Sequence, residues 1–478
     1  MSRIWLAVPL VLVYLLKPGG AGFLGPDEPR YASIGREMAH DGDWVTPRLN
    51  GSPWFEKPPL LYWTTAAANR LGLRDEWAAR VPMALISLTF LVFFHEILRR
   101  EFSPRLALAA TAILGGSAGW LVASFAAVPD LPMSAALAAA MMLALFDNRA
   151  HPQKPPKRRL RRAWAAGALL GVAILAKGFV PVALFAPAWW IAREKRLRIL
   201  AAAAIVAAPW YLLCWTRNGS AFWNDFFWKQ HVQRLISAQA LQHGQPFWYY
   251  VPVILVGLFP WTPLAALIGL KKAREDPRVR FLLLWALGAL VFFSIVPNKL
   301  PLYVLPLMPA LAVVMAAALE AVRGREWWLA ASLGSLILLP SIAGTFPEAY
   351  LEGATRTHWY FDPGGLIAVV AAAGIWWISR RGRWTAAMLA SSAIVAAGGA
   401  YLKLTTLAPL DQRDSARAFW RAHQGEIGEA CVEGDVPRAW VYGLSYYASR
   451  AVPDCRSSVA ESWEIRGQNG ALEIERRR

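Results

Sequence analysis

The sequence has few charged residues and few cysteines for its length. Only 17% of its 478 residues are Asp, Glu, Lys or Arg, whereas 56% are hydrophobic. A soluble chain of this length would need polar surfaces on two or three domains, so the composition indicates a polytopic membrane protein. The three cysteines form no CxxC pair, which argues against the common zinc motifs. Cys431 and Cys455 lie in a polar tail and can pair if that tail lies outside the cytoplasm.

The formal net charge of +18 comes from short basic clusters between apolar runs. Such clusters follow the positive-inside rule of membrane proteins and do not form a nucleic-acid-binding face. We therefore expect no nucleic-acid partner. The 25 tryptophans fit the same interpretation, because tryptophan gathers at the membrane–water interface.

Thirteen apolar segments could each cross a bilayer, which takes about 20 residues. They lie near residues 4–16, 79–98, 106–125, 131–147, 164–191 (two spans, with Lys177 and Gly178 at the tip between them), 199–215, 250–270, 281–296, 301–319, 327–343, 365–379 and 384–402. With the N-terminus inside, every strong basic cluster before the tail falls on one side, and the loop 18–78 falls outside. A cleaved signal peptide is the alternative for the first segment, because GGAG follows it.

We therefore predict an all-α membrane domain over residues 1–402 and a small outer α/β domain over residues 403–478. In this tail, DQRDSARAFWRAH predicts a helix, and EACVEG and RAWVYGLSYYA predict short strands. Nothing in the tail indicates catalysis.

The densest group of charges follows the first apolar segment, and charges near a membrane core are costly without partners or a function. Asp27 and Glu28 precede Pro29 and the amphipathic pattern PRYASIGREMAH, which predicts an interfacial helix. In the structural interpretation, one of the two carboxylates caps this helix. In the functional interpretation, both are presented at its N-terminus.

Glu56 and Lys57 precede two prolines and a second predicted helix with aromatic side chains. An exposed pair of this kind is ordinarily a solvated ion pair of little energetic value. The functional alternative is that Lys57 binds an anionic group while Glu56 orients it or holds a metal.

Further polar residues fall on the same outer side by the predicted topology. Each has an ordinary structural explanation, such as a helix cap or the cover of a hairpin tip. Together, carboxylates and several cations at one membrane face favour a phosphate-bearing lipid substrate. These residues are Asp130, Lys177, His231, Arg234, Lys299 and Tyr303.

DEPRYASIGREMAHDGDWVTPRLNG and FEKPPLLYW resemble the first outer loop of the aminoarabinose–lipid A transferases, which are relatives of protein O-mannosyltransferases. The resemblance continues through AKG, FFWKQHVQRL and KLPLYVLPLMPALA. It implies the GT-C fold, with many membrane helices, a catalytic outer loop and a small outer domain. It also implies a polyprenyl-phosphate sugar donor, typically undecaprenyl-linked, and a bacterial inner membrane enzyme acting on its periplasmic side.

The resemblance also implies site residues, which are named here by their positions in this sequence. The catalytic residues are Asp27 and Asp130; the donor-phosphate residues are Lys57, Arg234, Lys299, Tyr303 and Lys177; and the residues at a metal-associated position are Glu56 and His231. Glu28 then becomes the expected helix cap. A divalent metal ion is the one cofactor implied, although one Glu and one His are fewer than the four ligands of a structural zinc site.

We predict an inverting displacement at the sugar C1, in which cations stabilise the departing lipid phosphate and Asp27 accepts a proton or orients the acceptor. The tail is shorter than is usual in the lipid A enzymes. The acceptor therefore stays open between lipid A, another envelope glycan and a protein hydroxyl. A secondary transporter and a non-catalytic scaffold are the competing classes, but the charges gather at one face and not near the midplane.

Overall fold

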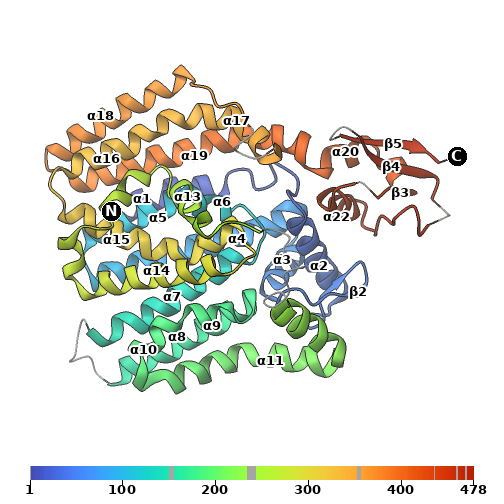
Figure 1. Cartoon of the computed structure of the whole chain (residues 1–478), viewed down its shortest axis with the longest axis horizontal. Helices are drawn as coiled ribbons and strands as arrows, with labels where there is room; N and C mark the ends of the chain where they lie inside the picture. The colour runs from blue at the N-terminus through green and yellow to red at the C-terminus, as the bar shows by residue number, and fades with distance from the viewer. Residues whose placement is uncertain are drawn as a thin grey trace.

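The computed structural model describes residues 2–149, 156–233, 244–352, 357–434, 436–458, 461–468 and 471–477. In this part of the chain, a large body of helices is followed by a smaller C-terminal unit that extends from one end of it (Figure 1). We use the term C-terminal unit for the described residues from 415 onward.

The helical body is built from helices of very different lengths. Its α-helices are α1 (Ser2–Leu15), α4 (Asp75–Glu101), α5 (Pro104–Gly116), α6 (Ala118–Ala123), α7 (Asp130–Arg149), α8 (Pro156–Lys177), α9 (Val180–Leu184), α10 (Ala186–Ile191), α11 (Arg196–Phe222), α13 (Tyr250–Gly257), α14 (Pro277–Ile295), α15 (Met308–Ala321), α16 (Arg325–Gly334), α17 (Leu339–Glu352), α18 (Ile367–Arg380) and α19 (Trp384–Asp414). Short 3₁₀ segments join them: η1 (Arg193–Lys195), η4 (Phe247–Tyr249), η5 (Thr262–Leu267), η6 (Lys271–Glu275), η7 (Pro301–Leu307), η8 (Ser335–Leu338) and η9 (Pro363–Leu366). A π-helical segment, η2 (Trp223–Gln233), follows α11.

Seven helical segments in the described residues are long and apolar enough to cross a membrane, and the chain is a multi-pass membrane protein. Each of the thirteen predicted segments coincides with helical structure, although several are divided into shorter helices. The segment 164–191 is one example. α8 ends at Lys177, Gly178 adopts a left-handed φ of +75°, and prolines near the starts of α9 and α10 begin new helices.

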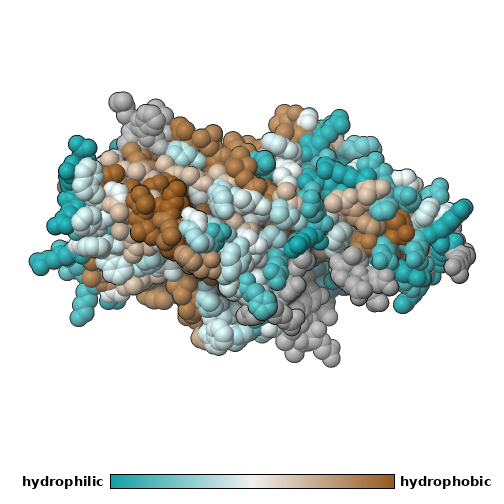
Figure 2. Space-filling model, turned by 90° about the horizontal axis from the view of Figure 1, so that it is seen from above, coloured by the Kyte–Doolittle hydropathy of each residue, from teal (hydrophilic) through white to brown (hydrophobic). Residues whose placement is uncertain are grey.

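Apolar side chains cover the outside of the helical body as well as its interior. Helix α15 is almost wholly buried at the centre. Peripheral helices expose large apolar side chains, including Ile205, Leu284 and Val370. Figure 2 shows hydrophobic residues gathered over this body, with hydrophilic residues at its left end and toward the C-terminal unit. A lipid-facing surface is expected to have this pattern.

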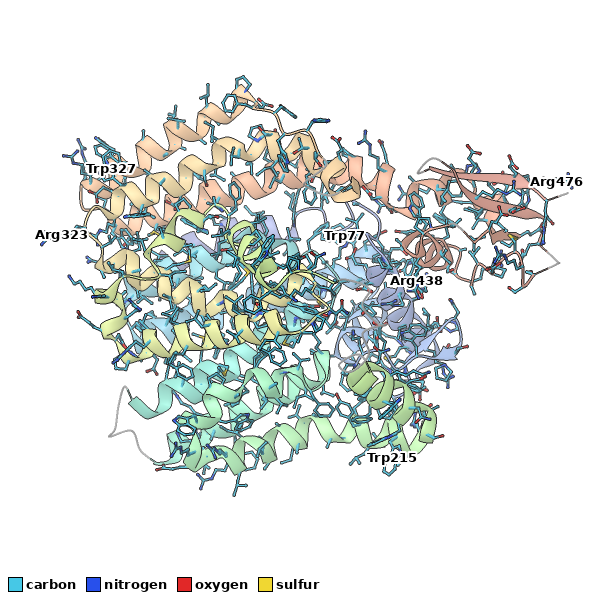
Figure 3. The ribbon with its side chains drawn as sticks, in the orientation of Figure 1. Trp77, Trp215, Arg323, Trp327, Arg438 and Arg476 are labelled. Carbon is cyan, nitrogen blue, oxygen red and sulfur yellow. A yellow bond between two sulfur atoms is a disulfide. The ribbon has the colours of Figure 1, made fainter. Side chains whose placement is uncertain are left out.

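The two ends of the body differ in what they carry. Arg323 and Trp327 lie at one end, whereas Trp77 and Arg438 lie near the other end (Figure 3). That second end holds α2 (Asp27–Asp41), α3 (Leu60–Arg70) and the small hairpin of β1 (Arg48–Leu49) and β2 (Ser52–Pro53). Helices α2 and α3 therefore form where the sequence predicts two helices in the first loop, and they lie at the same end as the C-terminal unit.

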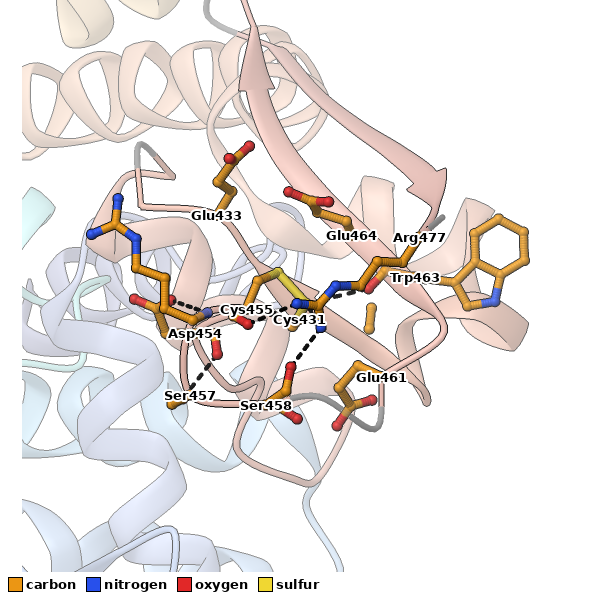
Figure 4. Close-up of a disulfide and its surroundings, with 12 residues drawn as sticks. Cys431, Glu433, Asp454, Cys455, Ser457, Ser458, Glu461, Trp463, Glu464 and Arg477 are labelled. Carbon is orange, nitrogen blue, oxygen red and sulfur yellow. Dashed lines mark hydrogen bonds between the residues drawn. A yellow bond between two sulfur atoms is a disulfide. The ribbon is translucent and has the colours of Figure 1, made fainter.

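The C-terminal unit is a small α/β structure. It contains α20 (Ala416–Ala422), α21 (Gln424–Ile427), β3 (Ala430–Val432), α22 (Arg438–Tyr447), β4 (Trp463–Gln468) and β5 (Ala471–Arg476). The strand order is β3-β4-β5, with β3 parallel to β4 and β4 antiparallel to β5. A disulfide joins Cys431 on β3 to Cys455, and the Arg477 guanidinium donates to the Cys455 carbonyl at 3.1 Å (Figure 4).

The structure of the tail differs from two predictions and contains two strands that the sequence did not predict. The stretch 438–448 was expected to be a strand because it is rich in aromatic residues, but most of it forms helix α22. Its buried residues Leu444 and Ser445 lie on a face that packs closely on α20, where Gly443 approaches Ala416. Tertiary packing therefore overrides β-propensity here. Strands β4 and β5 were not predicted, and the expected boundary at residue 402 falls inside α19.

Candidate active site

Helix α2 presents its acidic residues at its first turn. Asp27 and Glu28 are its first two residues, where negative charge complements the helix dipole. Tyr31, Ile34 and Met38 are each 3% exposed or less, so the predicted apolar face packs against the core. This packing fixes the orientation of α2 and the direction in which its first turn points.

Glu28 does not cap α2, so the expectation that it does is wrong. Its carboxylate is buried and accepts hydrogen bonds from the Arg80 guanidinium at 2.7 and 3.1 Å. It also accepts from the backbone N–H groups of Leu24 at 3.0 Å and Ala127 at 2.8 Å. Because Arg80 lies in α4 and Ala127 lies just before α7, Glu28 joins three elements instead of serving its own helix.

Asp27 lies in a chain of alternating charges. Its Oδ1 is 2.5 Å from Arg30 Nη2, and the same nitrogen is 3.0 Å from Glu56 Oε2. Lys57 Nζ is 3.5 Å from Glu56 Oε1. The Asp27 side chain is 44% exposed, whereas that of Glu56 is 10% exposed. The structure therefore brings Asp27, Glu56 and Lys57 together, and Asp27 is the carboxylate most open to an incoming molecule.

The surroundings of Asp27 make its carboxylate more basic. Loss of water around the carboxylate raises the pKa of Asp27 above its ordinary value, and Arg30 partly opposes that shift. Burial, reinforced by the charge of Glu56, raises the pKa of both Tyr31 and Tyr62 well above the ordinary phenol value. These two phenols are therefore hydrogen-bond donors at neutral pH, and Tyr31 OH lies 3.4 Å from Glu56 Oε1.

A second cluster contains Asp130, Lys177 and Tyr303. Asp130 begins α7, Lys177 ends α8, and their side chains form an ion pair with about a tenth of each side chain exposed. The Lys177 ammonium lies 4.2 Å from the centre of the Tyr303 ring. The charge of Asp130 also acts on Asp27, which means that the two clusters share one region of the protein.

Lys299 has a different environment. Its side chain is buried, and its ammonium donates to the carbonyls of Val296 at 2.8 Å and Gln245 at 3.1 Å. Among the described residues, no carboxylate lies within 4.0 Å of this ammonium. Lys299 is therefore a buried positive charge, and no described side chain neutralises it.

Two predicted residues cannot be placed in this geometry. The backbone of His231 lies in the π-helical segment η2, but its side chain lies outside the described part, as does the whole of Arg234.

The implied metal site pairs Glu56 with His231, and the side chain of His231 lies outside the described part. The described side chains by themselves do not form a metal site. They contain no group of three His, Cys, Asp or Glu residues placed to hold an ion. Glu56 already faces two cations, Arg30 and Lys57, which would repel a metal ion at the same carboxylate. We therefore derive no catalytic step through a metal.

Sequence reasoning did not assign a role to Arg30 or to Tyr442. Arg30 follows Asp27 by three residues, and that spacing puts the two side chains on one side of a helix, so the pair was detectable. Tyr442 lies on α22 with its ring 5.3 Å from the Arg30 guanidinium. No local pattern in the tail indicated this contact.

Comparison with known proteins gives relatives over most of the chain. It is 34% identical over 399 residues to the undecaprenyl phosphate-α-4-amino-4-deoxy-L-arabinose arabinosyl transferase of Serratia proteamaculans, which covers 78% of this chain and 70% of the relative. The enzyme of the same name from Yersinia enterocolitica is 34% identical over 330 residues, which is 65% of this chain and 58% of the relative. A family model described as dolichyl-phosphate-mannose-protein mannosyltransferase matches residues 56–216.

Solved structures share the fold. The crystal structure of ArnT from Cupriavidus metallidurans bound to undecaprenyl phosphate has a TM-score of 0.79 at 24% identity, covering 98% of this chain and 93% of that chain. The oligosaccharyltransferase AglB from Archaeoglobus fulgidus has a TM-score of 0.56 at 12% identity, covering 98% of this chain and 69% of that chain.

The body of apolar helices, with charged loop helices and a small extra unit at one end, has the GT-C fold of ArnT. The curated relatives add the activity, so the protein is a membrane glycosyltransferase. The chain belongs to the family of the undecaprenyl phosphate-α-4-amino-4-deoxy-L-arabinose arabinosyl transferases.

Proposed function

We propose that this enzyme transfers an aminoarabinose-type sugar from undecaprenyl phosphate to an envelope acceptor, with lipid A as the first candidate. The names of the curated relatives support the donor and the sugar. The bound molecule named for the Cupriavidus structure supports the lipid phosphate. A hexose-type sugar is the alternative, and the same residues would transfer it.

The observation that carries the proposal is the buried charge of Lys299, which has no carboxylate partner among the described residues. Burying an ammonium without a counter-charge is costly. Lys299 is buried and is solvated by two carbonyls. An anionic phosphate arriving beside it would supply the missing charge, whereas the described ion pairs of Lys57 and Lys177 are already balanced by Glu56 and Asp130.

The proposed reaction is a single inverting displacement at the sugar C1. A bond forms between C1 and an acceptor oxygen while the bond from C1 to the lipid phosphate oxygen breaks. Asp27 takes the proton of an acceptor hydroxyl, or orients an acceptor phosphate that carries no proton to lose. The departing phosphate gains charge, and Lys299, Lys57 and Arg234 stabilise it by charge-assisted hydrogen bonds. Asp130 keeps Lys177 and Tyr303 in place beside that phosphate.

We also propose thirteen membrane crossings, with the clusters and the C-terminal unit on the periplasmic side of the inner membrane. The position of Arg323 at the end opposite the α2 loop supports this orientation. The Cys431–Cys455 disulfide supports it as well, since disulfides persist in oxidising compartments.

The test is transfer by the purified protein in detergent, supplied with labelled undecaprenyl-phosphate aminoarabinose. We expect release of undecaprenyl phosphate and appearance of label on added lipid A. Label on a protein hydroxyl instead would favour the mannosyltransferase-like alternative, for which the family match over residues 56–216 is the supporting observation. Unchanged donor would contradict enzymatic transfer and favour a transporter. A chelator in the same assay tests the implied divalent ion. An unchanged rate would remove a catalytic role for the ion, and a loss restored by a divalent ion would show a metal requirement.

A further inference from the structure

The C-terminal unit lies directly against the helix that carries Asp27. In Figure 1, α22 lies beside α2. Arg36 of α2 donates to the Tyr446 carbonyl at 2.8 Å, and its guanidinium lies 4.0 Å from the centre of the Tyr446 ring. The Tyr446 ring also meets Phe23 edge-on, with 4.8 Å between ring centres. These contacts place one face of α22 along the active-site helix.

A buried polar network holds the unit in that position. Arg417 pairs with Glu76 of α4 at 3.2 Å and with Asp411 of α19 at 2.8 Å. Tyr447 OH donates to Glu76 at 2.5 Å. Arg417 and Glu76 have less than a tenth of their side chains exposed. Breaking one partner of a buried pair is strongly destabilising, so the network holds the C-terminal unit firmly on the membrane body.

The contact that reaches the active site is Tyr442 on Arg30. The rings of Tyr31, Trp54 and Tyr442 surround the Arg30 guanidinium at 5.2, 5.8 and 5.3 Å from their centres. Tyr31 and Trp54 come from the first loop, whereas Tyr442 comes from the C-terminal unit.

The ion pairs of Arg30 leave its orientation open. Both carboxylates, Asp27 and Glu56, are reached through the same nitrogen, Nη2. The buried Nε has no hydrogen-bond partner among the described residues. A guanidinium held through one nitrogen can pivot about it, and ring faces packed on its plane restrict that motion.

We propose that Tyr442 is a positioning residue of the active site, which keeps the Arg30 guanidinium between Asp27 and Glu56. The C-terminal unit thereby completes the catalytic site instead of serving only as an outer cap. This inference rests on the proposed role of Asp27 as the proton acceptor.

The charges around Asp27 make the effect measurable. Arg30 and Lys57 lower the pKa of Asp27, Glu56 and Asp130 raise it, and Lys177 is paired with Asp130. Arg30 is the largest of the lowering charges. Releasing Arg30 therefore raises the pKa of Asp27 further. As the pH falls, the ionised Asp27 carboxylate is then lost at a higher pH than in the unsubstituted protein.

The experiment compares the pH profile of kcat/KM for Tyr442→Ala and Tyr442→Phe in the full chain. Tyr442→Ala is expected to move the acid limb upward by about half to one pH unit, a part of the lowering of about 1–3 pKa units that a neighbouring cation gives a carboxylate. Tyr442→Phe keeps the ring and is expected to match the unsubstituted protein. Tyr442→Leu serves as a second ring-less variant if the alanine variant does not fold.

Arg438→Ala is the matched control, because Arg438 is an exposed residue of the same helix α22 and no described contact joins it to Arg30. We expect its acid limb to stay in place. An unshifted limb in folded Tyr442→Ala or Tyr442→Leu would overturn the proposal, and so would an equal shift in Arg438→Ala. Failure of the proposed function is separate from these outcomes, since it would appear as unchanged turnover in Asp27→Asn.

Discussion

At the scale of single residues, the site is a set of charges most of which are already paired. Arg30 lies between Asp27 and Glu56, and Lys177 is paired with Asp130. Such pairs hold side chains in place but carry no net charge toward a ligand. Asp27 is half-exposed although it is paired with Arg30, and Lys299 has no described carboxylate partner, so these two residues are the first candidates to test.

Asp27→Asn keeps the size of the side chain and removes its charge. We expect transfer to fall by about 100-fold or more, the typical contribution of a positioned acid or base. The variant should melt at the same temperature as the unsubstituted protein. Asp41→Asn, at the exposed end of the same helix, is the control and should keep full activity.

The rate should also fall on the acid side at an unusually high pH. The pKa of Asp27 is raised in the folded protein, so its carboxylate becomes protonated above the ordinary value of about 4 as the pH falls. The activity that depends on the ionised form is present above that raised pKa and is lost below it. A pH–rate profile with a limb at or below about 4 would contradict this assignment.

Lys299→Met removes the charge while keeping an apolar chain of similar length. Loss of one preorganised cation typically lowers the rate by about 100- to 1000-fold. We expect kcat/KM for the labelled donor to fall in that range, with partial recovery in Lys299→Arg. Lys229→Met is the control, because the Lys229 side chain is 61% exposed and paired with Asp225. If kcat/KM for the donor were the same in Lys299→Met and Lys229→Met, Lys299 would have no role in binding the donor phosphate.

At the scale of helices and loops, the Glu28–Arg80 pair sets the geometry. Arg80 also donates to the carbonyls of Pro18, Ala21 and Gly22, so the segment that leads into α2 is fastened to α4. The Ala127 N–H bound by Glu28 lies just before Asp130. One buried carboxylate thus aligns the starts of both helices that carry proposed catalytic residues.

Glu28→Gln should destabilise the protein by about 3–5 kcal/mol, because it leaves the Arg80 guanidinium buried without its counter-charge. Glu96→Gln is the matched control on α4. Glu96 pairs with Arg99 and Arg100 in a more exposed setting and should cost about 1 kcal/mol or less. Unfolding of the purified variants by a denaturing detergent measures the loss of stability in each of them. Equal stability of the two variants would show that the Glu28–Arg80 pair is not a structural anchor.

At the scale of the whole molecule, polar contacts join the C-terminal unit to the membrane body, and a disulfide links two segments within the unit. The Arg417 network attaches it to α4 and α19. Within the unit, the Cys431–Cys455 bond joins β3 to the segment that precedes β4. A sheet of three short strands buries little apolar surface, so a covalent link contributes a large share of its stability.

Replacing both Cys431 and Cys455 by Ser should loosen this unit by about 3 kcal/mol, because the bond closes a loop with a sequence separation of 24. Hydrogen exchange should become faster in β3, β4 and β5 and stay slow in α15. Cys214 is a free cysteine, so Cys214→Ser is the control and should leave hydrogen exchange in the C-terminal unit unchanged. Unchanged protection of the strands in the double variant would contradict this role.

The sequence alone determined the membrane class, the positions of the apolar segments, the two helices of the first loop and the dense group of charges that this loop carries. These features depend on the length of apolar runs, on helical periodicity and on charges adjacent in sequence, all of which are local. The spacing of Asp27 and Arg30 and the adjacency of Glu56 and Lys57 are local features of this kind. The ion pair between Arg30 and Glu56, which links the two pairs, is not local.

Only the tertiary structure decided which distant side chains meet. Arg80 pairs with Glu28 across 52 residues, and Lys177 pairs with Asp130 across 47. Tyr442 reaches Arg30 because α22 is a helix where its composition favoured a strand. The partner of a buried charge is set by how helices pack, since burial makes an unpaired charge costly and packing determines which opposite charge is within reach. No local pattern contains that information.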